Sequence, residues 1–134
     1  MRPSKDKYYL EIASVVLKRG TCIRRNYGAV IVNNDQIVGT GYTGAPRGEQ
    51  NCCDKNTCLR NEAGAKPGER YELCNSVHAE MNAILSAGRE RTIGATLYVA
   101  GKDAANNSVV SGKPCLLCSR MIINAGIARI VVLK

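Results

Sequence analysis

The chain has 134 residues, of which 45% are hydrophobic and 22% charged, with a formal net charge of +8 at neutral pH. This length is enough for one domain with its own core, and the composition excludes an intrinsically disordered chain. No apolar run approaches the roughly 20 residues of a membrane span, and residues 1–20 lack the apolar segment of a secretory signal, so we expect a cytoplasmic protein.

The positive charge favours an anionic partner, a nucleotide or a nucleic acid, although it could also serve solubility alone. The only aromatic residues are six Tyr. A row of stacking rings for single strands is therefore not evident, and we do not expect nucleic acid as the partner. Seven cysteines are a high count. Because no secretion signal precedes them, metal binding or catalysis is favoured over a disulfide framework.

The first half of the chain predicts a helix, a hairpin and a long loop. Apolar residues recur at helical spacing up to Gly20, which is a typical helix stop. The run GAVIV predicts a buried strand, and NND supplies the turn before the next strand. After this second strand comes a long loop rich in Gly, Pro and Asn. Loops of that length are uncommon unless they are functional or held in place. The predicted elements are a helix at 5–19, strands at 28–32 and 36–42, and an irregular loop at 43–58.

The second half of the chain alternates helix and strand. The order predicts an α/β domain in which helices cover a mixed sheet. Right-handed crossovers would make the last two strands parallel. The predicted elements are helices at 77–87 and 115–125, strands at 95–100 and 128–133, and a polar excursion at 101–113.

Three residues with metal-ligand chemistry stand at two predicted helix starts. His78 is the only histidine, and Cys115 and Cys118 follow Pro114, a residue suited to helix entry. The spacing of the two cysteines places both thiolates on one face of a helix. One imidazole and two thiolates suit Zn²⁺, and three protein ligands leave a fourth position for water, as in catalytic zinc sites.

Glu80 stands two residues after His78 and is not needed as a ligand. A carboxylate beside an activated water can take its proton and pass it to a leaving group. A lone histidine is usually structural, and a lone C-x-x-C is often a structural half-site or a redox pair. H-x-E followed by P-C-x-x-C is instead the signature of zinc deaminases that act on nucleobases. The pattern therefore predicts hydrolysis at an amidine-like ring carbon, with release of ammonia.

Five motifs together resemble the deoxycytidylate (dCMP) deaminases of the cytidine deaminase superfamily: GAVIV, GTGYTGAPRG, SVHAEMNAI, ATLYVA and PCLLCSRMIINAGIARIVV. The resemblance covers about residues 5–133 and implies a single zinc-dependent nucleotide deaminase domain over 1–134. It implies a three-layer α/β/α fold with a mixed central sheet, and a homo-oligomer, either hexamer or dimer. It also implies hydrolysis of dCMP to dUMP and ammonia, which supplies the precursor of thymidylate.

Carried over by position, the resemblance assigns roles to individual residues. His78, Cys115 and Cys118 would be the zinc ligands, Glu80 the proton shuttle, and the backbone of Ala79 would meet the cytosine. For the substrate phosphate, side-chain chemistry adds four candidates, because a guanidinium can bind two phosphate oxygens at once: Arg24, Arg25, Arg47 and Arg89. Family members activated by dCTP and inhibited by dTTP suggest an effector loop here, with candidate residues Gly41, Tyr42, Gly44 and Arg47.

Three features depart from the family pattern. Thr43 stands where the family usually has an Asn that touches the sugar, and a hydroxyl offers one donor where an amide offers two. Residues 101–113 intervene where many members run from the strand almost directly into Pro-Cys. This segment could cover the site, pack against a neighbour, or be a longer surface connection. The chain also stops after its last strand, so a sheet edge would need a partner or charged cover.

The remaining cysteines match a second, non-catalytic zinc that some family members carry. Cys22, Cys52 and Cys74 are the first choices by spacing, with Cys58 or Cys53 completing the set. Four thiolates make a satisfactory structural zinc site, which would order a loop poor in apolar residues. The alternatives are free thiols or one disulfide.

Two rival functions remain open from the sequence. The first is a related deaminase that acts on another cytosine nucleotide or nucleoside, on a free base, or on adenosine in tRNA. The second is a non-catalytic zinc module in which all seven cysteines are structural, so that replacing Glu80 would change nothing of importance.

Overall fold

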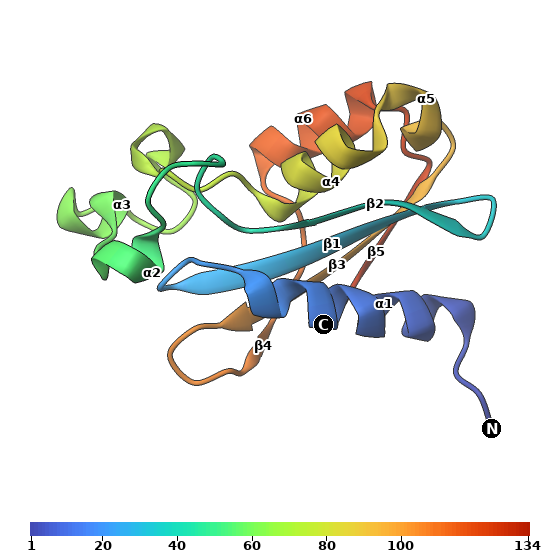
Figure 1. Ribbon diagram of the computed structural model, residues 1–134, viewed down its shortest axis with the longest axis horizontal. Helices are drawn as coiled ribbons and strands as arrows, with labels where there is room; N and C mark the ends of the chain where they lie inside the picture. Colours follow the sequence, from blue (N-terminus) through green and yellow to red (C-terminus); the bar gives the residue numbers. More distant parts are fainter.

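A five-stranded sheet forms the middle layer of the structure, a computed structural model that describes residues 1–134 (Figure 1). The strands are β1 (Arg25–Asn33), β2 (Gln36–Tyr42), β3 (Thr96–Asp103), β4 (Val109–Val110) and β5 (Arg129–Val132). Strand β1 pairs antiparallel with β2 and with β3. Strand β5 pairs parallel with β3, which confirms the predicted mixed sheet and the predicted parallel pair.

Helices cover both faces of this sheet, so the predicted three-layer α/β/α fold is confirmed. Helix α1 (Lys5–Val16) continues as a 3₁₀ turn, η1 (Leu17–Arg19), and packs on β1 and β3. Helices α4 (Ala79–Ala87) and α6 (Leu116–Asn124) lie on the opposite face, and α5 (Arg89–Thr92) follows α4 (Figure 1). No helix combines the length and apolar character needed to cross a membrane.

The alternation of side chains along β1 and β3 divides the core into two halves. Ala29 and Ile31 pack toward α4 and α6, whereas Val30 and Val32 pack toward α1. Successive side chains of a strand point to opposite faces, and both faces are covered here. This is why GAVIV reads as a continuous apolar run instead of an alternating one.

Helix α4 lies directly on β2 because both surfaces are made of small residues. Ala79, Ala83 and Ala87 are spaced four apart and face the strand. A Cβ added to Gly41 would overlap the carbonyl oxygen of Ala79, and one added to Gly39 would lie 2.5 Å from the carbonyl oxygen of Ala83. This close contact fixes the start of α4, where the site described below begins.

The predicted loop at 43–58 is longer than expected and contains short helical turns. It runs on to the start of α4 and holds α2 (Cys52–Lys55), α3 (Leu59–Glu62) and the 3₁₀ turn η2 (Tyr71–Leu73). A helix of four residues is too short to show a hydrophobic period, so the sequence pattern did not predict these turns. In Figure 1 this segment gathers at one end of the sheet, beside the first residues of α4 and α6.

The polar excursion at 101–113 contains a short hairpin. Strand β3 continues to Asp103, and the chain returns as β4, with Gly101 opposite Val110. The backbone N–H of Ala104 donates to the carbonyl of Arg24 at 2.8 Å, which joins this hairpin to the start of β1. Strands β4 and β5 both pair with β3, and β5 pairs with no other strand of the sheet.

Candidate active site

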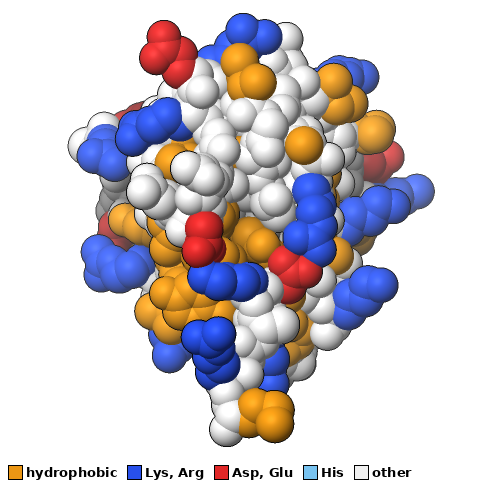
Figure 2. Space-filling model, turned by 90° about the vertical axis from the view of Figure 1, so that its right-hand side faces the viewer, with side chains coloured by type: hydrophobic (Ala, Val, Ile, Leu, Met, Phe, Trp, Pro, Cys, Tyr) orange, Lys and Arg blue, Asp and Glu red, His pale blue; other side chains and the backbone are white.

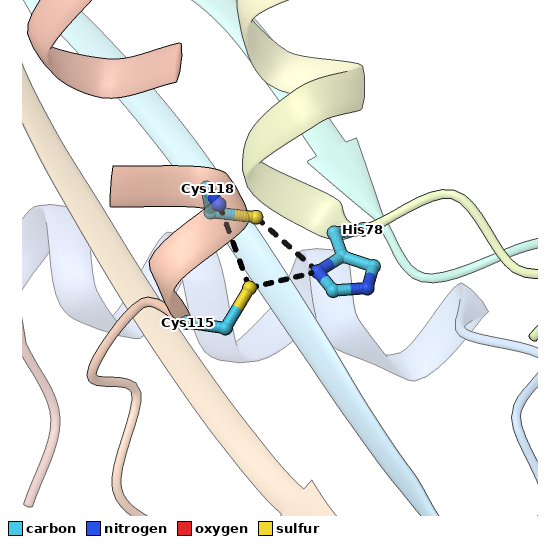
Figure 3. A group of neighbouring side chains, drawn as sticks. All are labelled: His78, Cys115 and Cys118. Carbon is cyan, nitrogen blue, oxygen red and sulfur yellow. Dashed lines mark hydrogen bonds between the residues drawn. The ribbon is translucent and has the colours of Figure 1, made fainter. Parts of the chain in front are cut away.

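Three side chains from two separate segments of the chain meet at the first turns of α4 and α6 (Figure 3). His78 is the N-cap of α4, and Cys115 is the N-cap of α6. The Nδ1 atom of His78 lies 3.2 Å from Sγ of Cys118 and 3.5 Å from Sγ of Cys115. The ligand atoms of the three residues all lie within 4.8 Å of one another. The structure thus brings together the three ligands chosen from the sequence.

This donor set fits a zinc ion. Burial raises the pKa of the Cys118 thiol, and the nearby Glu80 and Cys115 raise it further. Burial also lowers the pKa of His78, with a contribution from Arg60, so the imidazole stays neutral as a metal ligand must. Cys118 is buried, and His78 and Cys115 are half-buried. Two sulfurs and one imidazole this close together suit a divalent cation that accepts sulfur and nitrogen ligands.

Glu80 stands on the first turn of α4 and is 6% exposed. Burial raises its pKa, while its own backbone N–H and the Cys118 side chain act in the opposite direction. A buried carboxyl with a raised pKa can both accept and return a proton near neutral pH. The residue is therefore suited to proton transfer beside the three ligands.

A pocket of about 1020 Å³ opens over these residues. Its lining includes His78, Glu80 and Cys115, together with Thr43 and Tyr71 from the segment between β2 and α4. The volume is at the upper end of what small-molecule sites in proteins usually offer. The pocket therefore has room for a nucleotide-sized ligand beside the three metal-ligand side chains.

Cationic side chains outnumber acidic ones around this pocket. The two acidic residues in the lining are Glu72 and Glu80. Five cationic residues line the pocket: Arg24, Arg25, Arg60, Lys113 and Arg120. The Nη1 atom of Arg24 is buried without a hydrogen-bond partner, so it has a donor left for a ligand. This charge distribution suits an anionic ligand such as a phosphate.

Three of these cations were not among the residues selected from the sequence. Lys113 precedes Pro114, and Arg120 follows Cys118 on α6, so their closeness to the metal-ligand motif was the available signal. No pattern marked Arg60, because it belongs to a short helix without periodicity. The lysines and arginines on the face in Figure 2, which views the molecule from the α5 end, are scattered and form no single patch.

Arg89, selected as a phosphate candidate, is not brought to this pocket. It stands after the last turn of α4, at the opposite end from His78, and its Nε donates to the carbonyl of Asn124 at 3.2 Å. The axial rise of α4 separates it from the metal ligands. Its role in the structure is to bind an unpaired carbonyl at the end of α6.

Thr43 lines the pocket and is 7% exposed. Its hydroxyl accepts a hydrogen bond from the backbone N–H of Tyr27 at 3.1 Å, and its own N–H donates to the carbonyl of Tyr27. The hydroxyl proton remains able to donate to a ligand. Ala79, the residue expected to meet the base through its backbone, is fully buried at the start of α4.

The residues of the expected effector loop have different surroundings. Gly41 lies under α4, and the carbonyl of Tyr42 accepts a hydrogen bond from Asn82 at 2.9 Å. Gly44 forms a two-residue bridge with Val77, directly before the metal-ligand histidine. Arg47 is exposed. The loop is therefore joined to the start of α4 by hydrogen bonds and close packing, whereas the side chain of Arg47 is exposed to solvent.

Four of the other cysteines line the same pocket as the site: Cys22, Cys52, Cys58 and Cys74. Burial raises the pKa of the Cys52 thiol, and the thiols of the other three add to that effect. No three of these sulfurs approach one another as closely as the ligand atoms of the first site. Cys53 is exposed, and all seven cysteines are free thiols. Among the two candidates for the fourth position, the structure thus favours Cys58 over Cys53.

Comparison with known sequences finds relatives over nearly the whole chain. A family model described as the cytidine and deoxycytidylate deaminase zinc-binding region matches residues 3–134. The deoxycytidylate deaminase of Mycobacterium phage D29 is 42% identical over 135 residues, which cover 97% of this chain and 94% of that protein. The deoxycytidylate deaminase of Schizosaccharomyces pombe is 38% identical over 132 residues, but this chain spans only 37% of its length.

A solved structure shows the same fold. The dCMP deaminase of cyanophage S-TIM5, in complex with dCMP and dUMP, superposes with a TM-score of 0.66 at 26% sequence identity. The match covers 97% of this chain and 81% of that one.

Proposed function

Since this chain belongs to the cytidine and deoxycytidylate deaminase family, we propose that it hydrolyses dCMP to dUMP and ammonia with one catalytic zinc ion. The observation that carries this proposal is the meeting of His78, Cys115 and Cys118 in a pocket that also holds Glu80. The phage D29 relative, which this chain covers almost completely, supports dCMP as the substrate. The cations around the pocket support a substrate that carries phosphate.

His78, Cys115 and Cys118 would hold the zinc ion and leave one position open toward the pocket. When bound, zinc supplies a Lewis acid that brings the pKa of a water molecule near neutrality. The buried Glu80 carboxylate takes the proton of the attacking water and delivers it to the ring nitrogen N3 of cytosine. The water oxygen bonds to C4, and Glu80 then takes the remaining proton of that oxygen and passes it to the amino group. The C4–N bond breaks, and ammonia leaves.

Other residues of the pocket would orient the nucleotide. The backbone at Ala79 meets the cytosine, and the free hydroxyl proton of Thr43 donates to the sugar. Arg24 and Arg25 bind the phosphate, supported by the unpaired and buried Nη1 atom of Arg24. These contacts would use binding energy to hold the cytosine ring in a fixed orientation relative to the Glu80 carboxylate.

We also propose a second, structural zinc held by Cys22, Cys52, Cys58 and Cys74. Its support is the position of all four thiols around one pocket, in a segment with few buried apolar residues. A bound metal would stabilise this segment, which has few buried apolar side chains to hold it in place.

We further propose that the chain forms a homo-oligomer and that dCTP and dTTP regulate it. Its product would supply the precursor of thymidylate in the cytoplasm. Exposed apolar side chains on α4 and α6 and the free edge of β5 offer surfaces for a second copy of the chain. The exposed Arg47, on the loop that connects to the start of α4, offers a charge for a nucleotide effector. Residues 1–134 would act as one catalytic domain.

The test is ammonia release from a substrate panel, together with a zinc count per chain. We expect turnover of dCMP, and little or none of CMP, deoxycytidine or a tRNA anticodon stem. Glu80→Ala should lose turnover while keeping its zinc, because this residue is not a ligand. Activity on the tRNA alone would replace dCMP by another substrate, and an unchanged Glu80→Ala variant would favour a non-catalytic zinc module.

A further inference from the structure

The wall of the pocket between α3 and α4 is organised around a buried arginine. Arg60 is only 8% exposed. Its Nε donates to the carbonyl of Glu69 at 2.9 Å, and its Nη2 donates to the carbonyl of Lys66 at 3.3 Å. Its guanidinium carbon lies 4.6 Å from the centre of the Tyr71 ring. The side chain thus holds together a stretch of chain that has few buried apolar residues.

These contacts distinguish Arg60 from the other cations of the pocket. Two of its nitrogens are already used by carbonyl groups, and one face of its guanidinium covers an aromatic ring. Arg24, in contrast, retains a buried nitrogen without a partner. Arg60 is therefore engaged within the protein, and a ligand phosphate is better served by its neighbours.

The ring of Tyr71 extends this arrangement to the metal-ligand histidine. The centroids of the Tyr71 and His78 rings lie 5.1 Å apart with an angle of 80° between their planes, an edge-to-face contact. The side chain of His78 makes hydrogen bonds only through Nδ1, which faces Cys115 and Cys118. No side chain or carbonyl of the chain accepts a hydrogen bond from its Nε2.

Metal-binding histidines usually have their ring orientation fixed by a hydrogen bond from the second nitrogen. In this chain the His78 ring has no such bond and instead packs against the ring of Tyr71, which in turn lies under the guanidinium of Arg60. Edge-to-face aromatic pairs have a preferred geometry, so the contact restricts rotation of the imidazole.

We infer that Arg60 and Tyr71 are positioning residues for His78, which hold its imidazole with Nδ1 toward the two sulfurs and thereby retain the metal. This inference rests on the proposed zinc-dependent function, and it adds two residues that the chemistry itself does not use.

The test measures metal retention without substrate. Zinc-loaded protein is mixed with a chromophoric chelator, and the rate of zinc release is compared between the wild type and Tyr71→Leu. We expect release to be at least about tenfold faster in the variant, as for loss of other groups that orient a metal ligand. The Co²⁺-loaded protein should show an altered absorption spectrum, because the imidazole no longer approaches the ion at one angle. Tyr71→Phe, which keeps the ring, should recover slow release and the wild-type spectrum.

Matched variants separate positioning from a general loss of stability. Tyr8→Leu removes a tyrosine ring from α1, on the other face of the sheet, and should not change zinc release. Arg60→Lys keeps the charge but cannot reach two carbonyls with one planar group, and should accelerate release. Arg70→Lys, an exposed change in the same segment, should not. Thermal unfolding of each variant monitors folding, and Arg60→Lys provides the test if Tyr71→Leu does not fold.

Wild-type release rates and spectra in both Tyr71→Leu and Arg60→Lys would overturn the inference. A wild-type protein that binds zinc but does not turn over dCMP would instead overturn the proposed substrate, and would leave the positioning result intact.

Discussion

Two regions of the molecule build opposite sides of the same pocket, and they are stabilised in different ways. The first turns of α4 and α6 rest on the sheet, where alanines and glycines pack without a gap and Cys118 is part of the core. Residues 43–77 form the facing wall, with short helical turns, free thiols and one buried arginine. The metal ligands thus belong to a part that folding makes rigid, whereas the wall depends on polar contacts and on any metal it binds.

The largest effect should come from breaking the rigid side. In Gly41→Ala the new Cβ overlaps backbone atoms at the start of α4. We expect a loss of about 3 kcal/mol in unfolding free energy, which is roughly 10 °C in Tm for a chain of this size. Gly44→Ala is the control, because a Cβ there meets only ordinary contacts. Equal melting temperatures for the two variants would contradict the close packing of α4 on β2.

The wall should respond to metal removal, while the sheet should not. If the second zinc is bound, chelation will expose residues 43–77 to limited proteolysis, and far-UV circular dichroism will keep its strand signal. Cys52→Ser should reproduce this cleavage pattern in metal-replete buffer and should lower the zinc count from two per chain to one. Cys53→Ser, the exposed neighbour, is the control. Uniform protection after complete zinc removal would show that polar contacts alone hold the wall.

The cationic side chains between these two sides of the pocket's lining should determine the affinity for phosphate. Arg120 lies on α6 and Arg24 lies before β1, and both line the pocket. Removing either guanidinium should raise KM for dCMP by roughly 10-fold to 100-fold, since a charge-assisted hydrogen bond is lost. Deoxycytidine, which has no phosphate, serves as the internal control. An equal loss with both substrates would mean that these arginines act through the fold.

The smallest effect concerns the far face of the sheet, where α1 is tied to β5. Asp6 accepts hydrogen bonds from Arg129 and Tyr98, and both contacts, the Arg129 bond first, hold its pKa below the ordinary value of an aspartate. Because the folded pKa is lowered, the stabilisation is complete above the unfolded pKa and is lost as pH falls below it. We expect Asp6→Asn to lower Tm by a few degrees at pH 7, corresponding to less than about 1 kcal/mol for this exposed pair. The difference should shrink as the pH falls through the lowered pKa of Asp6, and Glu11→Gln should lower Tm at neither end of that range.

The sequence predicted the rigid side better than the wall. Continuous apolar strands, helices ended by glycine and the helix-start positions of His78 and Cys115 all leave a periodic or positional signal. The short helices and strand β4 leave none, because two to four residues do not complete a hydrophobic period. Arg60 and Tyr71 were missed for a related reason, since their contacts join segments whose approach depends on the course of a loop. Arg89 was selected by its closeness in sequence to α4, but the helix carries it to the wrong end.

The two helix caps have a consequence for how the ion enters. His78 and Cys115 each close the first turn of a nine-residue helix, and the backbone N–H of Cys118 already points at Sγ of Cys115 at 3.5 Å. The first turn of α6 therefore directs a backbone donor at one of the ligand sulfurs. Since both helices are anchored by apolar packing, folding alone arranges the three ligands, and loading with zinc should be a fast second-order step that requires no refolding.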